Sequence, residues 1–210
     1  SNAYTIVISS ADATATASDL NTLDAKTTVT IDAGAITELS GTYAEVTALY
    51  GSAGVDNLGD EAISISDALT VTQANEIESL TTAVVTASIA TTETVDSLLN
   101  LAGTNAYTIV ISSADATGST AAEFNTINAL TTVAVDLTNV TSITSSSFDD
   151  LETLATAIGN SEFSNTTGFT TITVSDAAVD ATVLAATIDT YDSINGSGTT
   201  LIELNLSLIH

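Results

Sequence analysis

The chain has 210 residues, of which 44% are hydrophobic and 4% aromatic, and its 26 acidic residues outnumber the single basic residue, Lys26, to give a formal net charge of −25. Such a polyanion repels phosphate backbones and anionic headgroups, so we expect neither nucleic-acid binding nor membrane attachment. The chain has no cysteine, which excludes disulfides and thiolate sites, and no apolar run approaches the roughly 18 residues that span a bilayer.

The chain contains an internal duplication. The run Ala-Tyr-Thr-Ile-Val-Ile-Ser-Ser-Ala-Asp-Ala-Thr occurs at 3–14 and again at 106–117. Self-similarity at a fixed period is typical of repeat proteins, in which each unit buries its apolar face against its neighbours. We therefore expect two tandem repeats, 4–105 and 106–210, in one continuous body. We interpret residues 1–3 as the remnant of an expression tag, and the chain as a segment of a longer protein.

Each repeat contains about four smaller units in which a strand precedes a short helix. Alternating apolar and polar residues predict strands at 4–9, 28–32, 62–66, 83–88, 107–112, 132–136, 171–175 and 200–205. Apolar residues three or four apart predict short helices that begin behind Ser18, Thr42, Thr72, Thr92, Thr120, Ser145 and Asp180. Two of these helices start with a capping box, Thr42 with Glu45 and Thr120 with Glu123.

These elements predict an α/β repeat fold. We expect a right-handed parallel solenoid of about eight strand-plus-short-helix coils, similar in design to leucine-rich repeats, because equivalent strands joined by helices pair in parallel. If several helical stretches are loops or 3₁₀ turns, the alternative is a straighter parallel β-helix with few helices. Either arrangement exposes apolar surface at both ends, so we also expect end-to-end self-association.

The residues that most enzymes use are scarce in this chain. The single histidine is His210, and there is neither arginine nor cysteine, so Ser-His-Asp, Cys-His and His-based zinc sites are not expected. Carboxylate pairs are the remaining option. The two adjacent acidic pairs, Asp60 with Glu61 and Asp149 with Asp150, are interpreted as surface or helix-start charges. We expect no catalysis, and no cofactor unless calcium binds.

An aspartate recurs at or just after the predicted strand ends. The six residues are Asp12, Asp32, Asp67, Asp115, Asp136 and Asp176. Stacked carboxylates repel one another unless a cation bridges them or each accepts hydrogen bonds from its turn. Two interpretations therefore stay open, a row of weak calcium sites or a set of turn-forming aspartates. The net charge likewise indicates either a saline, calcium-rich setting or a solvated acidic surface without bound ions.

Several phrases of the sequence resemble a known class of repeats. Leu-Asn-Thr-Leu-Asp-Ala-Lys-Thr-Thr-Val-Thr-Ile-Asp at 20–32, Ile-Asn-Ala-Leu-Thr-Thr-Val-Ala-Val-Asp at 127–136 and Ile-Ser-Asp-Ala-Leu-Thr-Val-Thr-Gln-Ala-Asn at 65–75 resemble Thr/Ala/Asp-rich repeats of very large secreted or cell-surface bacterial proteins, notably from marine cyanobacteria. Some of those proteins also carry hemolysin-type calcium-binding repeats, whose Gly-Gly-x-Gly-x-Asp nonapeptide is absent here. The resemblance covers essentially the whole chain. It implies an extracellular location, a structural or adhesive role and calcium dependence, and it supplies no catalytic residues.

The sequence thus predicts a non-enzymatic spacer or surface rod, a segment of a giant extracellular or cell-surface protein. Its expected partners are neighbouring repeats of the same chain. The alternative is a binding module that recognises a glycan or a protein on its sheet face. The outward sheet face discriminates between the two, because a uniform Thr, Ser and Asp face favours a spacer, whereas clustered aromatic residues favour recognition.

Overall fold

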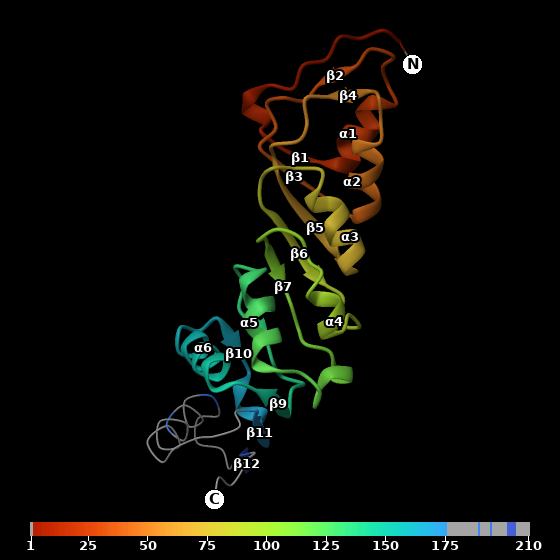
Figure 1. Ribbon diagram of the computed structural model, residues 1–210. Helices are drawn as coiled ribbons and strands as arrows, with labels where there is room; N and C mark the ends of the chain where they lie inside the picture. The colour runs from red at the N-terminus through yellow and green to blue at the C-terminus, as the bar shows by residue number, and fades with distance from the viewer. Residues whose placement is uncertain (1, 176–188, 190–193, 195–200, 205–210) are drawn as a thin grey trace, which may run out of the picture. The chain divides into compact units, whose positions relative to one another are not determined.

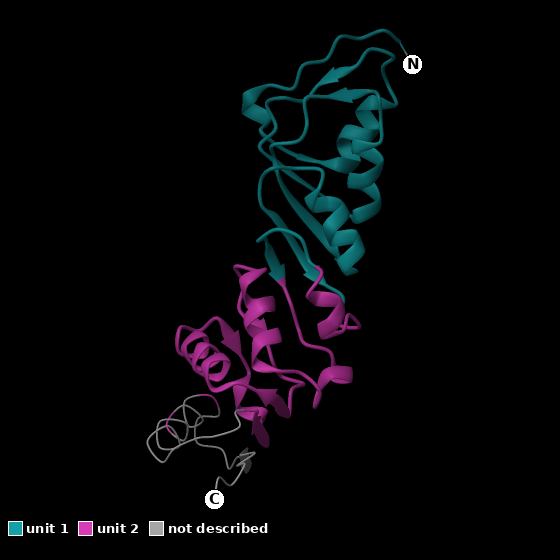
Figure 2. Cartoon of the chain, viewed as in Figure 1, with its two compact units in different colours: residues 1–90, 101–107 teal, residues 91–100, 108–210 magenta. Residues whose placement is uncertain are grey.

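The structure of the chain is a computed structural model that describes residues 2–175, Asp189, Ile194 and the backbone of 201–204 (Figure 1). This part of the chain divides into two compact units, residues up to 90 with 101–107, and residues 91–100 with those from 108 onward (Figure 2). The predicted helix behind Asp180 lies outside the described residues. Within them, no helix combines the length and apolar character needed to cross a membrane.

The first unit is built on a parallel sheet covered by three helices. The sheet runs in the order β1 (Thr14–Thr16), β3 (Glu38–Gly41), β5 (Ala62–Leu69), β6 (Val85–Ile89) and β7 (Ala106–Thr108). The helices α1 (Ala17–Asp24), α2 (Tyr43–Tyr50) and α3 (Val71–Glu78) lie side by side along this sheet (Figure 1). A second small parallel sheet pairs β2 (Ile31–Asp32) with β4 (Val55–Asp56).

The strand register of the first unit separates a core face from an outward face. Leu39 pairs with Ile63, and Ile63 pairs with Val85; all three side chains are buried. Because successive side chains of a strand alternate between faces, the next position on each strand faces outward. There the paired residues all carry hydroxyl groups: Ser40, Ser64 and Thr86.

In its described residues, the second unit combines three helices with two small parallel sheets. Its helices are α4 (Val95–Leu98), α5 (Ala121–Ala129) and α6 (Phe148–Gly159). One sheet runs in the order β12 (Leu201–Leu204), β11 (Thr171–Val174) and β9 (Ser142–Ser146), and the other pairs β10 (Phe163–Ser164) with β8 (Val135–Asp136). Fully buried side chains from α5 and α6 supply much of the core: Phe124, Ile127, Leu151 and Leu154.

The prediction of one right-handed parallel solenoid of about eight strand-plus-helix coils is wrong, as is its β-helix alternative. In the described residues the fold is mixed α/β, with a five-stranded parallel sheet, separate sheets of two or three strands and six helices. Seven of the eight predicted strands overlap an observed strand, although those at 28–32 and 132–136 are reduced to two residues each. Residues 4–9 contribute only an isolated bridge between Val7 and Asp32, whereas β1 and β3 lie outside the predicted strands.

The helix starts follow the expected chemistry. The capping boxes at Thr42 and Thr120 are confirmed, since each threonine hydroxyl accepts from the N3 backbone and each N3 glutamate accepts from the cap backbone. The same box occurs at Thr70 with Gln73, which the sequence analysis missed. These side chains satisfy amide groups that have no partner inside the helix.

Four other predicted helix starts are displaced by two residues. The observed N-caps are Thr16, Thr70, Thr94 and Ser147, where Ser18, Thr72, Thr92 and Ser145 were expected. In three of the four helices the residue directly after the observed cap is buried: Ala17, Val71 and Val95. Packing against the core therefore selects which of two nearby hydroxyl residues caps the helix.

We expect Thr42→Ala to lower the free energy of unfolding by about 1 kcal/mol, because it removes the hydroxyl that accepts from the Glu45 amide. The measurement is urea unfolding followed by circular dichroism. Thr47→Ala is the matched control on the same helix. Its hydroxyl donates only to helix carbonyls, that of Tyr43 at 2.9 Å, so this change should be neutral or slightly stabilising. Equal losses from the two changes would contradict the cap assignment.

Candidate functional site

The recurrent aspartates are the first candidate site, and the structure places five of the six. Asp176 lies outside the described residues. Across the part of the chain that the structure describes, no group of three or more His, Cys, Asp or Glu side chains could hold a metal ion. The calcium row stays a prediction, and the contacts of each aspartate show what its carboxylate does in this structure.

Asp32 is held in a small polar clamp at the end of β2. Its Oδ1 accepts hydrogen bonds from the Asn57 side-chain amide at 2.8 Å and from the Gly34 backbone at 3.2 Å. The Asn57 bond and then the Gly34 bond hold the pKa of the Asp32 carboxyl below its ordinary value. Both donors stabilise the ionised form, as in an Asx turn.

Asp136 repeats this clamp in the second unit. Its Oδ1 accepts from the Thr138 backbone at 2.8 Å and from the Asn165 side-chain amide at 2.9 Å. Asn57 and Asn165 both adopt positive φ, 64° and 56°, a left-handed conformation that asparagine tolerates better than most residues. The sequence analysis missed both asparagines as partners. The signal that could have found them is their shared place, directly after the second strand of a two-stranded sheet.

Two other aspartates accept from the first backbone amide of a helix. In the first unit, the Tyr43 N–H at the start of α2 donates to Asp67 Oδ1 at 2.8 Å. In the second unit, the Val95 N–H at the start of α4 donates to Asp115 Oδ2 at 3.0 Å. Each carboxylate supplies an acceptor to an amide that has no partner within its own helix. The aspartate lies 20 to 24 residues beyond the helix start that it serves.

Asp12 differs from the other described aspartates. It belongs to an exposed 3₁₀ helix, Ser10–Asp12, and its backbone N–H donates to the Ser9 carbonyl at 2.8 Å. Among the described residues, no group donates a hydrogen bond to its carboxylate.

The interpretation of Glu61 as a surface charge is wrong. Its side chain is fully buried, and Oε2 accepts from the backbones of Gly59 at 2.8 Å and Asp60 at 3.1 Å. Its Oε1 is buried and has no hydrogen-bond partner in the described part of the chain. By contrast, Asp149 and Asp150 do lie in the first turn of α6, as the sequence analysis expected.

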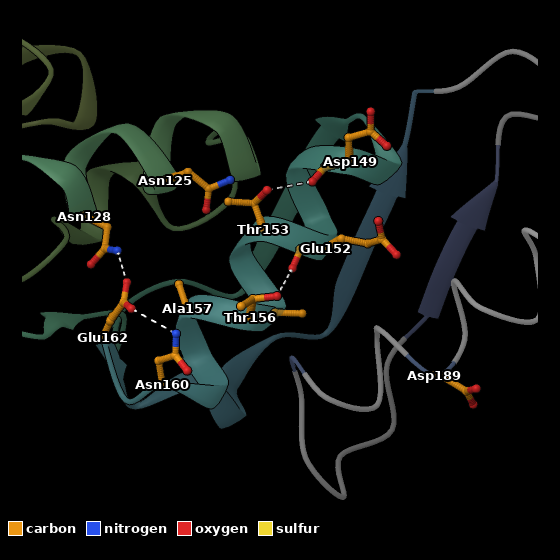
Figure 3. A pocket seen from close by; sticks show the side chains of 11 residues that line it. Asn125, Asn128, Asp149, Glu152, Thr153, Thr156, Ala157, Asn160, Glu162 and Asp189 are labelled. Atoms are coloured by element: carbon orange, nitrogen blue, oxygen red, sulfur yellow. Dashed lines mark hydrogen bonds between the residues drawn. The ribbon is translucent and has the colours of Figure 1, made fainter.

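The second unit has an open hollow of about 970 Å³ beside α5 and α6 (Figure 3). It is lined mainly by polar and acidic side chains: Asn125, Asn128, Asp149, Glu152, Thr153, Thr156, Asn160, Glu162 and Asp189. Several of these groups already bond to one another or to the helix backbone. Glu162 accepts from Asn128 at 2.6 Å and from Asn160 at 3.2 Å, and the Thr153 hydroxyl donates to the Asp149 carbonyl. Among the described residues, the lining contains no aromatic or basic side chain and indicates no substrate class.

No family model, curated protein or solved structure matches this chain. The function is therefore argued from the geometry of the chain itself, in which most of the described candidate aspartates bind backbone or amide N–H groups.

We expect Asn57→Gly to raise the pKa of Asp32 toward its ordinary value, because glycine accepts the positive φ and only the amide donor is lost. The ionised carboxylate stabilises the fold above the pKa of an unfolded aspartate, and this stabilisation is lost as the pH falls through the lowered native pKa. The variant should therefore be less stable than the original chain at neutral pH, and its free energy of unfolding should change less as the pH falls.

Carboxyl NMR titration of Asp32 gives the pKa, and melts at neutral and acid pH give the stability. Asn165→Gly is the matched control. It removes the equivalent clamp of Asp136 and should leave the titration of Asp32 unchanged. An Asp32 pKa that does not move in Asn57→Gly would show that the clamp does not set it.

We expect sodium chloride and calcium chloride to raise the melting temperature equally at matched ionic strength. Most described candidate carboxylates already accept N–H donors, so screening of the −25 charge should be the main effect. Melts in calcium, in sodium and in chelator measure this. A rise specific to calcium would instead show that the native state binds the ion.

Proposed function

We propose that the chain is a non-enzymatic structural segment of a very large extracellular or cell-surface protein, where it acts as a spacer that presents other parts of that protein. The family resemblance of its Thr/Ala/Asp-rich phrases suggests this role. The character of the sheet surface is the observation that carries it.

The outward face of the first unit's sheet is small and hydroxyl-rich. On β1, β3, β5 and β6 the alternating positions that face away from the core are Thr14, Thr16, Glu38, Ser40, Ala62, Ser64, Ser66, Thr86 and Ser88. These four strands contain no aromatic residue. A uniform face without aromatic anchors offers little for specific recognition of a sugar or a protein, and this favours a spacer.

Side chains tie neighbouring segments together in both units. The Asn21 amide on α1 donates to the Glu45 carbonyl on α2 at 2.9 Å, and the Asn125 amide on α5 donates to the Asp150 carbonyl on α6 at 2.9 Å. Each bond joins segments that lie 24 or 25 residues apart in the chain. Such bonds resist separation of adjacent segments, which suits a part that bears load.

Display on a yeast surface tests the proposal. One, two or three tandem copies are placed between a wall anchor and a peptide epitope, and capture of antibody-coated particles is counted. We expect capture to rise with each added copy, because a spacer carries the epitope farther from the wall. Capture that does not depend on copy number would contradict a spacer.

The sheet-face variant Ser64→Lys is the control, since Ser64 is exposed and faces away from the core. Under the spacer proposal it leaves particle capture unchanged. Binding of the chain without its epitope to a glycan or a cell, abolished by Ser64→Lys, would establish the alternative of a binding module.

A further inference from the structure

The two copies of the duplicated dodecamer share a backbone contact with the residues that follow them. In the first copy the Ile8 N–H donates to the Asp32 carbonyl at 2.8 Å. In the second copy the Ile111 N–H donates to the Asp136 carbonyl at 3.0 Å. The second copy has one further downstream bond, from the Asn139 amide to the Ile111 carbonyl at 2.8 Å.

The exposure of the two copies differs sharply. Tyr4 is 54% exposed, whereas Tyr107, its equivalent, is fully buried. Val7 is 65% exposed, whereas Val110, its equivalent in the second copy, is half-buried and therefore less exposed. Because the residues are identical, the difference comes from the neighbours of each copy, and for the tyrosine these neighbours lie upstream.

Residues upstream of the second copy cover its tyrosine, all within the first unit. The Asn105 amide donates to the Tyr107 hydroxyl at 3.3 Å, while Asn105 Oδ1 accepts from the Val85 backbone of β6 at 2.9 Å. Burial, and next the nearby Glu78 charge, raise the pKa of Tyr107 to about 12. Asn105 therefore links the tyrosine to the strand that precedes it.

Among the described residues, the first copy lacks such a cover. Tyr4 is exposed, and its backbone N–H donates to the Thr27 hydroxyl at 3.1 Å, on the downstream side. Asn2 belongs to the segment interpreted above as a tag remnant, so the comparable surface begins at Tyr4.

The aspartates of the dodecamer show the same contrast. Within the second unit, Asp115 accepts from the Val95 N–H at the start of α4. Its equivalent in the first copy, Asp12, has no donor among the described residues. An acceptor for the start of a preceding helix is therefore also present in the first copy.

We infer that the surface formed by residues 4–12 binds the end of a preceding copy of the same repeat, through a segment equivalent to residues 75–105. In that complex a helix equivalent to α4 donates to Asp12, and the segment covers Tyr4 and Val7. This inference deepens the proposed function and rests on it, because it requires the chain to be one of several tandem copies.

An extended chain tests the inference. Residues 4–106 are repeated directly before Tyr4, which reproduces the junction found at Tyr107. Nitration by tetranitromethane, read by peptide mass spectrometry, reports the exposure of each tyrosine. In the original chain Tyr4 should react at least about tenfold faster than Tyr107, and in the extended chain the same Tyr4 should be protected to a similar degree.

Two matched substitutions give a second readout. In the original chain Asp115→Ala should lower the melting temperature by about 2 to 4 °C, because the start of α4 loses its acceptor, whereas Asp12→Ala should have no effect. In the extended chain, Asp12→Ala at the junction should become as costly as Asp115→Ala.

Three outcomes would overturn the inference. The first is a Tyr4 that stays reactive in the extended chain while Asp12→Ala stays neutral. The second is an added copy that remains unfolded by circular dichroism, since every segment it packs against is present. The third is protection of Tyr4 in the original chain with dimers in sedimentation, which would make a second chain the occupant.

Failure here is separable from failure of the proposed spacer. A flexible junction would leave Tyr4 reactive and still let epitope capture rise with copy number. A docked junction in a chain that does not act as a spacer would protect Tyr4 without that rise.

Discussion

The parallel register between segments about 24 residues apart is the constraint on which the rest of the structure depends. It aligns Leu39, Ile63 and Val85 in one buried row, and it places each helix beside the next. Side chains can then reach the backbone of the neighbouring segment, as Asn21 does at the carbonyl of Glu45. Because the chain has one basic residue, carboxylates such as Asp67 and Asp115 accept hydrogen bonds from backbone N–H groups. The register brings those donors close to the carboxylates.

Helices were more predictable than strands. Capping boxes at Thr42 and Thr120 are local signals, written within four residues, and they hold in the structure. Strands β1 and β3 have three and four residues and form because a partner strand lies alongside; runs this short are too brief for alternation alone to predict them. The predicted solenoid failed for this reason, since period-2 alternation at 4–9 did not secure a continuous partner.

The aspartates show the same limit at the level of the site. Their recurrence was visible in the sequence, and so was the option that they form turns. The sequence did not predict the asparagine donor of each clamp, because Asn57 lies 25 residues from Asp32 and Asn165 lies 29 residues from Asp136. The burial of Glu61 was hidden likewise, since its donors belong to a loop whose path is set by Gly59 at a φ of 133°.

The duplicated tyrosine and aspartate have a consequence for how such a protein changes over generations. If each copy carries both the covering segment and the surface to be covered, every junction in an array is the same junction. Recombination between the segments that encode equivalent copies would then remove or add whole copies without creating a new kind of interface. The length of the protein becomes a freely adjustable trait, while the packing at each joint is inherited unchanged.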